Sequence, residues 1–558
     1  MPALPCQAFR FSIAGLLLLG LAWAVPRAAS AEPPALQRID LHRNGGVGDD
    51  VAVTVGIPFA PGQLQDVARV RILDAQEHEI AAHVEPMLYW YPNKRSIRAV
   101  RAQFRAHLTG DTAHYFFAFD APRTIDAPGW PYADGMIEAE AGLKVPGVLG
   151  TLDAEWLTAS LIAGPQQPAD PANAYDRYVD TQFAWAKALP TRESSAWLFD
   201  RTSTLFKQYV RTGRLDYLQA AVLSYRFYMA HITRNAPLFK RSCVGEFAFG
   251  EVKPCDAKYV YVEPILLAVG LTGDDSEHDA ALVDSMIGVW QRHAAETHQP
   301  YARVDQSFTE RFAGLGLLET VSAYELTGKA AYLEDVGRRL VWLRDHQAAN
   351  PDKHPPDGSW RNSWQTHEGA PYDAVYDVRG TSPWMSENIA DGLWHAWLVT
   401  GDARIPPMLV AFGGYLERYG WIAADTLAQH ASDWGRDPCS GPDGQMSWYW
   451  SSSLATPQTL IDLQTHNGKY TDQHNVELAL PVALARYFTS DPAQAKALEH
   501  RLALIAGSYA QGCARNDETA RRFNWNNRSG GTVQWLVKHF PAPGTPPERP
   551  AVIPAAAQ

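Results

Sequence analysis

A turn that recurs between apolar helical segments constrains the fold of this chain most. Apolar residues on either side of each turn fit one helical face, and a glycine directly after a helix favours the left-handed conformation that ends it. Five such hairpins at intervals of about 55 to 89 residues predict a closed ring of hairpins, with an open helical solenoid as the alternative. The turns are Arg211-Thr-Gly-Arg214, Leu271-Thr-Gly-Asp274, Leu326-Thr-Gly-Lys329, Val399-Thr-Gly-Asp402 and Phe488-Thr-Ser-Asp491.

The segment from about Gln37 to Asp120 has a different period. Val51-Ala-Val-Thr-Val55 alternates, and further β runs follow at 70–73, 96–104 and 114–119. Short strands at hairpin spacing predict a compact β barrel or sandwich. The expected fold class is therefore α+β and multidomain, with a small N-terminal β domain followed by an (α/α)6-type helical toroid.

We expect five segments along the chain. They are a signal peptide at 1–31, a β domain at 32–124, a connecting segment at 125–190, a helical toroid at 191–540 and a disordered Pro/Ala-rich tail at 541–558. A sixth hairpin can come from 150–188 or from 532–539.

The N-terminal residues have the pattern of an export signal. Arg10 precedes a short apolar stretch at 11–25, and Ala29-Ser-Ala31 fits a cleavage site before Glu32. We expect a periplasmic or secreted protein with no membrane span after cleavage, and an uncleaved anchor is the alternative. Four cysteines follow the predicted cleavage site. Their even number in an exported chain favours disulfides Cys243–Cys255 and Cys439–Cys513, with free buried thiols as the alternative.

Composition narrows the class of partner. A net charge of −12 argues against nucleic acid. The chain has 19 Trp, 23 Tyr and 20 Phe, and the apolar faces of sugar rings stack well on aromatic planes. The expected partner is a poly- or oligosaccharide, bound by a monomer.

A stretch of about ninety residues resembles a known family. Val53-Thr-Val-Gly-Ile-Pro-Phe-Ala-Pro-Gly62, then Tyr89-Trp90 and then Ser96-Ile-Arg98, is similar to the N-terminal RIFT-barrel domain of the exo-rhamnogalacturonan lyase family. That family continues through a central β-sandwich to a C-terminal α/α toroid. This chain has only about 65 residues, 125–189, where the sandwich would stand, so no catalytic residue is carried over.

Long connections between hairpins locate the expected site. They fall at about 231–263, 293–311, 346–387 and 425–477, on the face opposite the tight turns. Glu310 and Arg311 stand at a helix start, where Ser307-x-x-Glu310 also fits a capping box. Glu387 and Asp391 share a helical face, and burial of such a pair would raise one pKa.

The last of these connections is the densest in proton-transfer groups, with Lys469, Tyr470 and His474. A polar surface loop is its alternative interpretation. Residues expected to bind substrate are Tyr261, Trp364, Asp377, Arg379, Trp384, Trp448 and Trp450.

Motifs for other chemistries are absent from the sequence, which has no G-x-S-x-G, H-E-x-x-H, P-loop or G-x-G-x-x-G. No cofactor is expected to be required and no metal ligands are assigned, although 274–279 is a weak calcium candidate. We expect a polysaccharide lyase, with His474 or Tyr470 as the base and Arg311 or Lys469 holding a uronate. A glycoside hydrolase using Glu387, Asp391 or Glu310 is the alternative, and a non-catalytic glycan-binding protein the third.

Overall fold

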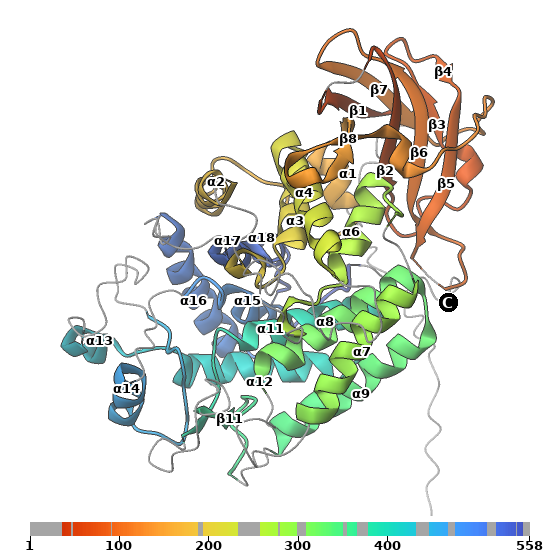
Figure 1. Cartoon of the computed structure of the whole chain (residues 1–558). Helices are drawn as coiled ribbons and strands as arrows, with labels where there is room; N and C mark the ends of the chain where they lie inside the picture. Colours follow the sequence, from red (N-terminus) through yellow and green to blue (C-terminus); the bar gives the residue numbers. More distant parts are fainter. Residues whose placement is uncertain are drawn as a thin grey trace, which may run out of the picture. The chain divides into compact units, whose positions relative to one another are not determined.

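The computed structural model in Figure 1 describes an N-terminal β region followed by a mostly helical C-terminal part. All described residues belong to the second of two units, Leu36–Gln558. They are 36–45, 48–90, 92–187, 194–232, 257–276, 280–297, 309–349, 354–364, 378–430, 446–466, 475–510, 521–542 and 544–550. The predicted signal peptide and all four cysteines of the predicted disulfides lie outside these residues.

Among the described residues, the β region contains two larger sheets and a separate two-stranded hairpin. The five-stranded sheet has the order β10-β1-β7-β3-β4, and the three-stranded sheet has the order β2-β6-β5. The four predicted β runs overlap β2, β3, β6 and β7, so this part of the prediction is confirmed. The strands are β1 (Leu36–Arg43), β2 (Asp50–Pro58), β3 (Arg71–Leu73), β4 (Glu79–Ile80), β5 (Ala82–Tyr89), β6 (Ile97–His107) and β7 (Thr112–Ala118).

The β region extends further along the chain than expected. A hairpin of β8 (Met136–Glu138) and β9 (Lys144–Pro146) leads into β10 (Val148–Thr151). Strand β10 pairs antiparallel with β1, in register from Asp40↔Thr151 to Arg43↔Val148. The segment that we expected to be a connection therefore supplies an edge strand of the larger sheet.

The helices form hairpins at the predicted turns. Gly213, Gly273, Gly328 and Gly401 each end a helix with φ of 63°, 71°, 69° and 65°, the left-handed conformation that glycine adopts without strain. The fifth turn, which has no glycine, ends its helix with extended Thr489. The helices joined in this way are α3 (Arg201–Thr212) and α4 (Leu215–His231), α6 (Glu263–Thr272) and α7 (Ala280–Thr297), α8 (Glu310–Thr327) and α9 (Ala330–Ala348), α11 (Ser386–Thr400) and α12 (Ile405–Tyr415), and α15 (Ala479–Phe488) and α16 (Pro492–Ala510).

The first helices of these hairpins contact one another in series. Helix α3 contacts α6, α6 contacts α8, α8 contacts α11, and α11 contacts α15. Helix α15 then contacts α18 (Gly530–Lys538), which in turn contacts α3. Both segments considered for a sixth hairpin contribute here, since α2 (Ala174–Lys187) packs on α16 and on α17 (Arg521–Asn527). Shorter helices are α1 (Ala154–Ala159), α13 (Ala424–His430) and α14 (Pro457–His466).

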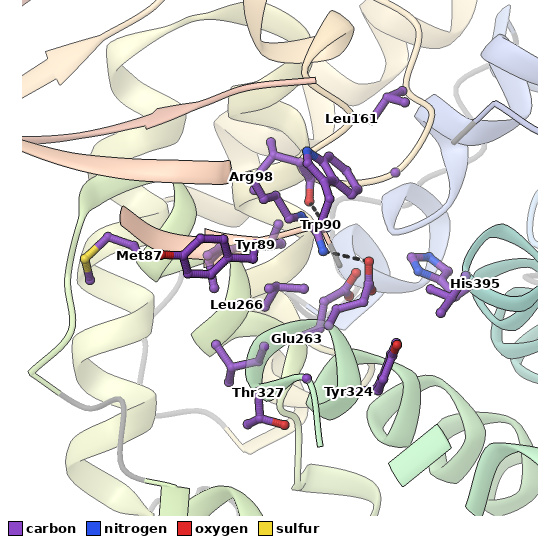
Figure 2. A pocket seen from close by; sticks show the side chains of 18 of the residues that line it. Met87, Tyr89, Trp90, Arg98, Leu161, Glu263, Leu266, Tyr324, Thr327 and His395 are labelled. Atoms are coloured by element: carbon purple, nitrogen blue, oxygen red, sulfur yellow. Dashed lines mark hydrogen bonds and ion pairs between the residues drawn. The ribbon is translucent and has the colours of Figure 1, made fainter. Parts of the chain in front are cut away.

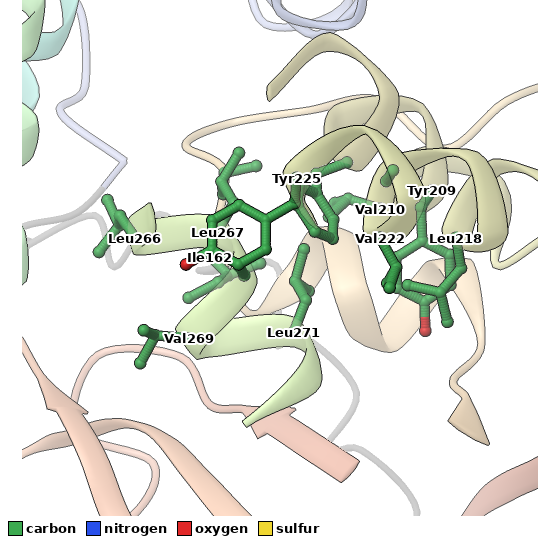
Figure 3. Packing of buried hydrophobic residues seen from close by; sticks show 14 of the residues in the cluster. Ile162, Tyr209, Val210, Leu218, Val222, Tyr225, Leu266, Leu267, Val269 and Leu271 are labelled. Atoms are coloured by element: carbon green, nitrogen blue, oxygen red, sulfur yellow. The ribbon is translucent and has the colours of Figure 1, made fainter. Parts of the chain in front are cut away.

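Burial explains why these helices hold their places. Figure 3 shows side chains of α3, α4 and α6 in one buried cluster, which includes Tyr209, Val222 and Leu267. All ten residues of α6 are buried. Each fully buried Leu or Val contributes about 1.5–3 kcal/mol relative to an exposed one.

The β region packs directly on the helical part. Strands β2 and β6 contact α6, and Gly56 of β2 lies against the end of that helix. A Cβ at Gly56 would stand 2.5 Å from the backbone of Leu271 and Thr272. A side chain at this position would therefore force the strand and helix apart.

Described residues of the C-terminal tail contact α15. Arg486 donates a hydrogen bond to the carbonyl of Pro541 at 3.3 Å, and the hydroxyl of Tyr487 donates to the carbonyl of Glu548. These contacts place the described tail residues on α15, and the disorder of the tail stays a prediction. Among the described helices, none has the length and apolar character needed to cross a membrane.

Candidate functional site

A pocket lies where several helices of the contacting series begin. Its lining residues lie just before α3, at the start of α11, just before α15, and in or directly after α17. The described residues enclose about 10 Å³ there, room for about one water molecule. The lining residues are Phe199, Trp384, Glu387, Asn388, Glu477, Trp525 and Arg528.

Three aromatic rings form one wall of the pocket. Trp384 and Trp525 stack with their ring centroids 5.2 Å apart and their planes 25° from parallel. Phe199 meets both rings edge to face, at 6.2 Å from Trp384 and 4.9 Å from Trp525. This wall is apolar, and the polar groups of Glu387, Asn388, Glu477 and Arg528 line the pocket beside it.

The backbone that presents Phe199 is strained. Phe199 and Asp200 have φ of 64° and 57°, values that residues other than glycine rarely adopt. The hydroxyl of Tyr261 accepts a hydrogen bond from the Phe199 amide at 2.9 Å, and the Asp200 carboxylate accepts one from Ser203 as the N-cap of α3. Tyr261, which we expected to bind substrate, is buried and acts here by holding Phe199 in place.

Two carboxylates share one buried guanidinium beneath the aromatic wall. Arg528 lies 2.9 Å from Oε2 of Glu387 and 3.2 Å from Oδ2 of Asp391. All three side chains are buried. Glu387 Oε1 has no hydrogen-bond partner among the described residues, although the residue lines the pocket. Glu387 and Asp391, which were predicted to share one helical face, both contact Arg528, a residue that the prediction did not include.

The two carboxylates differ in pKa. Burial is the largest cause that raises the pKa of Glu387; with the charges of Asp391 and Glu477, and against the opposing charge of Arg528, it brings that pKa to about 7. Burial also raises the pKa of Asp391, but the charges of Arg528 and His395 outweigh it, so that pKa is lowered. Glu387 can therefore hold a proton near neutral pH while Asp391 is ionised.

A second buried charge cluster lies behind the first. Lys207 is 2.8 Å from Glu263, and the carboxylates of Glu263 and Asp391 outweigh burial and raise the pKa of Lys207. Burial and the Glu263 charge raise the pKa of Asp200 to about 7. Glu319 accepts hydrogen bonds from the amides of Val262 and Glu263 at the start of α6, and burial raises its pKa. This cluster supports the pocket from below and does not line it.

Arg311 lies beside the aromatic wall. Its guanidinium carbon is 5.5 Å from the Phe199 ring centroid and 5.9 Å from that of Trp384. Its Nη2 donates to the sulfur of Met385 at 3.6 Å. Within the described part of the chain, no carboxylate pairs with Arg311, so its charge remains available to an anionic ligand.

Glu310, the neighbouring candidate, has a different environment. Its carboxylate accepts hydrogen bonds from Thr381 Oγ1 at 2.6 Å, from the Ser382 amide at 2.8 Å and from Asn362 at 2.8 Å. The residue is fully buried and does not line the pocket. Its oxygens are occupied in tying the start of α8 to the chain ahead of α11. The N-cap of α8 is Thr309.

The remaining predicted aromatic residues form a separate core. Trp364 packs edge to face on Trp450 at 5.7 Å, and both are buried with Trp448. This core reaches the pocket wall through Tyr449, whose ring centroid is 5.7 Å from that of Trp384. Of the predicted substrate-binding residues, Trp384 lines the pocket, whereas Trp364, Trp448 and Trp450 support it from behind.

Some predicted site residues lie elsewhere. Arg379 is half-buried in β12 (Arg379–Gly380), which pairs with β11 (Asn362–Ser363). Lys469, Tyr470, His474 and Asp377 lie outside the described residues. In the weak calcium candidate, Asp274 is buried and pairs with Arg226 at 2.6 Å. The described residues contain no group of three or more potential metal ligands.

Sequence reasoning missed Phe199, Trp525, Arg528 and Lys207. The run Asn524-Trp-Asn-Asn-Arg528 carried a usable signal, because amides, an aromatic ring and a cation rarely concentrate in five residues that serve only as surface. Phe199 and Lys207 carried none, since each resembles an ordinary helix or turn residue.

Comparison with known proteins adds no relative. No family model matches the chain, and no curated protein sequence is significantly similar to it.

Proposed function

We propose that this chain hydrolyses glycosidic bonds at the pocket around Glu387. One observation carries the proposal: Glu387 is buried at an aromatic wall, one of its carboxyl oxygens has no hydrogen-bond partner among the described residues, and its pKa is raised to about 7. A general acid works best when its pKa lies near the operating pH. Glycoside hydrolysis is a reaction that needs such an acid together with a second carboxylate.

Glu477 is the best second carboxylate. It lines the same pocket and lies close enough for its charge to raise the pKa of Glu387. In the proposed step, protonated Glu387 gives its proton to the glycosidic oxygen as the C–O bond to the sugar breaks. Glu477, acting as the base, takes a proton from the attacking water, whose oxygen bonds to the anomeric carbon. Trp384 and Trp525 would form the apolar wall beside the reacting groups, while Arg528 keeps Glu387 in place.

A single substitution tests the assignment. Glu387→Gln keeps the shape of the side chain and removes the acid, so turnover on the best substrate of a polysaccharide panel should fall about 10²–10⁴-fold. Glu417→Gln is the control. Glu417 pairs with Arg501, with 3.1 Å between the charged groups, and it does not line the pocket. Release of reducing ends measures turnover. Full activity in Glu387→Gln would exclude Glu387 as the acid.

A β-eliminating lyase is the second candidate, favoured by Arg311. Its guanidinium lies at the aromatic wall without a carboxylate partner among the described residues, as the binding of a uronate would require. His474 or Tyr470 would then be the base, with Lys469 as a further cation. A lyase forms an unsaturated product that absorbs at about 235 nm as reducing ends appear, whereas a hydrolase yields reducing ends alone. Under this reading His474→Ala, and not Glu387→Gln, would be the severe variant.

We also propose the scaffold and location that fit this activity. The series of contacts from α3 through α6, α8, α11, α15 and α18 back to α3 supports an α/α toroid, a scaffold that gathers helix N-termini around one site. The resemblance of the β region to the RIFT-barrel domain of exo-rhamnogalacturonan lyases remains a proposal as well. Export to the periplasm or medium predicts a mature N-terminus at Glu32, and sequencing that finds Met1 intact would contradict it.

A further inference from the structure

A second and larger cavity lies where the β region meets the helices. Its volume is about 660 Å³, within the range of small-molecule sites. Strand β5 and the residues after it form one side, and the ends of α8 and α11 form the other (Figure 2). Along α11, Glu387 of the first pocket and His395 of this cavity are eight residues apart, or about 12 Å.

The motif residues of the β region build one wall of this cavity. Trp90 donates its indole N–H to the Phe59 carbonyl at 2.8 Å, and Ser96 accepts a hydrogen bond from the Gly62 amide at 2.8 Å. The guanidinium of Arg98 stacks on Trp90, 4.4 Å from a ring centroid. The similarity noted in the sequence thus corresponds to a fixed set of contacts at the cavity.

Arg98 connects this wall of the cavity to the helical part. Its Nη1 lies 2.7 Å from Glu325 of α8, and its Nη2 donates to the Ile162 carbonyl at 2.9 Å. The side chain is 3% exposed, and its Nε has no hydrogen-bond partner among the described residues. A buried N–H donor left without a partner favours a ligand that can accept from it.

The lining combines flat rings with apolar side chains. Tyr89 and Trp90 come from the β side, and Tyr324 comes from α8. All three rings are half-buried and so keep surface for contact. Leu266, Leu267 and Leu398 add apolar surface. This mixture suits a ring with apolar faces and polar edges, as sugars have.

Among the described lysines and arginines that line the cavity, one cation remains without a carboxylate partner. The charges of Arg98 and Glu325 cancel, as do those of Lys329 with Asp284 and Lys207 with Glu263. Lys94 is exposed at the cavity and lies 5.4 Å from the Tyr89 ring centroid. No carboxylate in the described part of the chain pairs with it, so the lining favours an anion beside an aromatic ring.

From this arrangement we infer that the cavity binds an acidic oligosaccharide, with the sugar rings on Tyr89, Trp90 and Tyr324 and a uronate carboxylate at Lys94. The sugar class rests on the proposed function, whereas the site itself does not use Glu387 or Glu477. The cavity would bind sugar rings of the substrate or product that lie away from the bond that is cleaved.

Titration calorimetry on full-length Glu387→Gln tests this inference, because that variant should bind without cleaving. The probes are a trisaccharide of galacturonic acid and the matched trisaccharide of galactose. We expect two binding events for the acidic probe. Lys94→Met in the same background should weaken one event about fivefold, as for an exposed ion pair, and leave the galactose trisaccharide unaffected. Lys496→Met, an exposed lysine on α16, is the control.

The outcomes separate this site from the catalytic proposal. A single binding event that Lys94→Met does not change would overturn the inference, as would equal affinity for the two probes. Tyr89→Ala should weaken the same event, and an unchanged affinity would argue against stacking. If wild-type protein cleaves nothing in the panel while Lys94-dependent binding persists, the proposed function fails and this site stands.

Discussion

At the scale of single residues, the distribution of charge around Arg528 should set the pH dependence of activity. The raised pKa of Glu387 owes part of its shift to the ionised Asp391. Asp391→Asn removes that charge while leaving Arg528 paired with Glu387, so the pKa of Glu387 should fall. Because a general acid is active when protonated, the fall of kcat with rising pH should begin at lower pH in the variant.

A pH–rate profile checks this expectation. Asp335→Asn is the matched control, because Asp335 pairs with Arg338 and Arg339 on α9 at 3.1 and 3.2 Å and does not line the pocket. If kcat falls at the same high pH in Asp391→Asn as in wild type, the charge of Asp391 does not affect the pKa of the catalytic acid.

Asp200 should make the protein less stable as pH rises. Burial raises its folded pKa to about 7, above the ordinary value of 3.8. A group with a raised folded pKa contributes stability that is complete below the unfolded pKa and is lost as pH rises through the folded one. The loss should therefore occur between about pH 4 and pH 7, and it should amount to about 1–4 kcal/mol at about 1.4 kcal/mol per pKa unit.

Asp200→Asn isolates this effect. Asparagine is a good N-cap and tolerates the left-handed conformation that the position requires. The variant should unfold at higher denaturant concentration than wild type at pH 8, and the difference should vanish near pH 4. A difference that is constant across this range would rule out titration of Asp200 as its source.

At the scale of elements, the close packing of α8 on α11 positions the pocket. A Cβ added at Gly314 would stand 2.2 Å from the backbone carbon of Asn388, which follows Glu387. Gly314→Ala should therefore push the start of α11 away and reduce turnover at least tenfold, with a loss of stability of about 1–3 kcal/mol as for other overpacked sites. Gly337→Ala is the control.

Gly337 lies within α9 with no atom within 4 Å of an added Cβ. Alanine there should stabilise the protein by about 0.5–1 kcal/mol and leave activity unchanged. Chemical denaturation and reducing-end assays measure both variants. If Gly314→Ala behaves like Gly337→Ala, the contact between the helices does not position Glu387.

Elements defined by local chemistry could be read from the sequence, and those defined by distant partners could not. The turns ending at Gly213, Gly273, Gly328 and Gly401 follow from the conformational freedom of glycine, which is a local property. Strand β10 has only four residues and exists because it pairs with β1, about a hundred residues earlier. No local pattern announces such a strand.

The same reasoning applies to the site. Glu387 and Asp391 were found because one helical turn separates them. Arg528, which joins them, lies 141 residues from Glu387. The roles of Glu310 and Tyr261 could not be predicted either, because a carboxylate or hydroxyl near a site binds substrate or supports the backbone according to which atoms the fold brings to it.

At the scale of the whole molecule, the junction between the β region and the helices should determine whether they unfold together. Gly56 of β2 permits close approach to the end of α6, and Arg98 of β6 pairs with Glu325 of α8 across the same junction. A shared interface of this kind predicts one cooperative transition for the described unit.

Gly56→Ala should loosen that junction. The added Cβ would lie 2.5 Å from the backbone of Leu271 and Thr272, and backbone cannot rotate aside as a side chain can. We expect a loss of about 1–3 kcal/mol and a broadened or split transition in calorimetry, because the helices and the β region would lose their common boundary. Gly110→Ala, where nothing lies within 4 Å, should leave a single transition. A single, unshifted transition in Gly56→Ala would mean that the β region and α6 are not packed as closely as described.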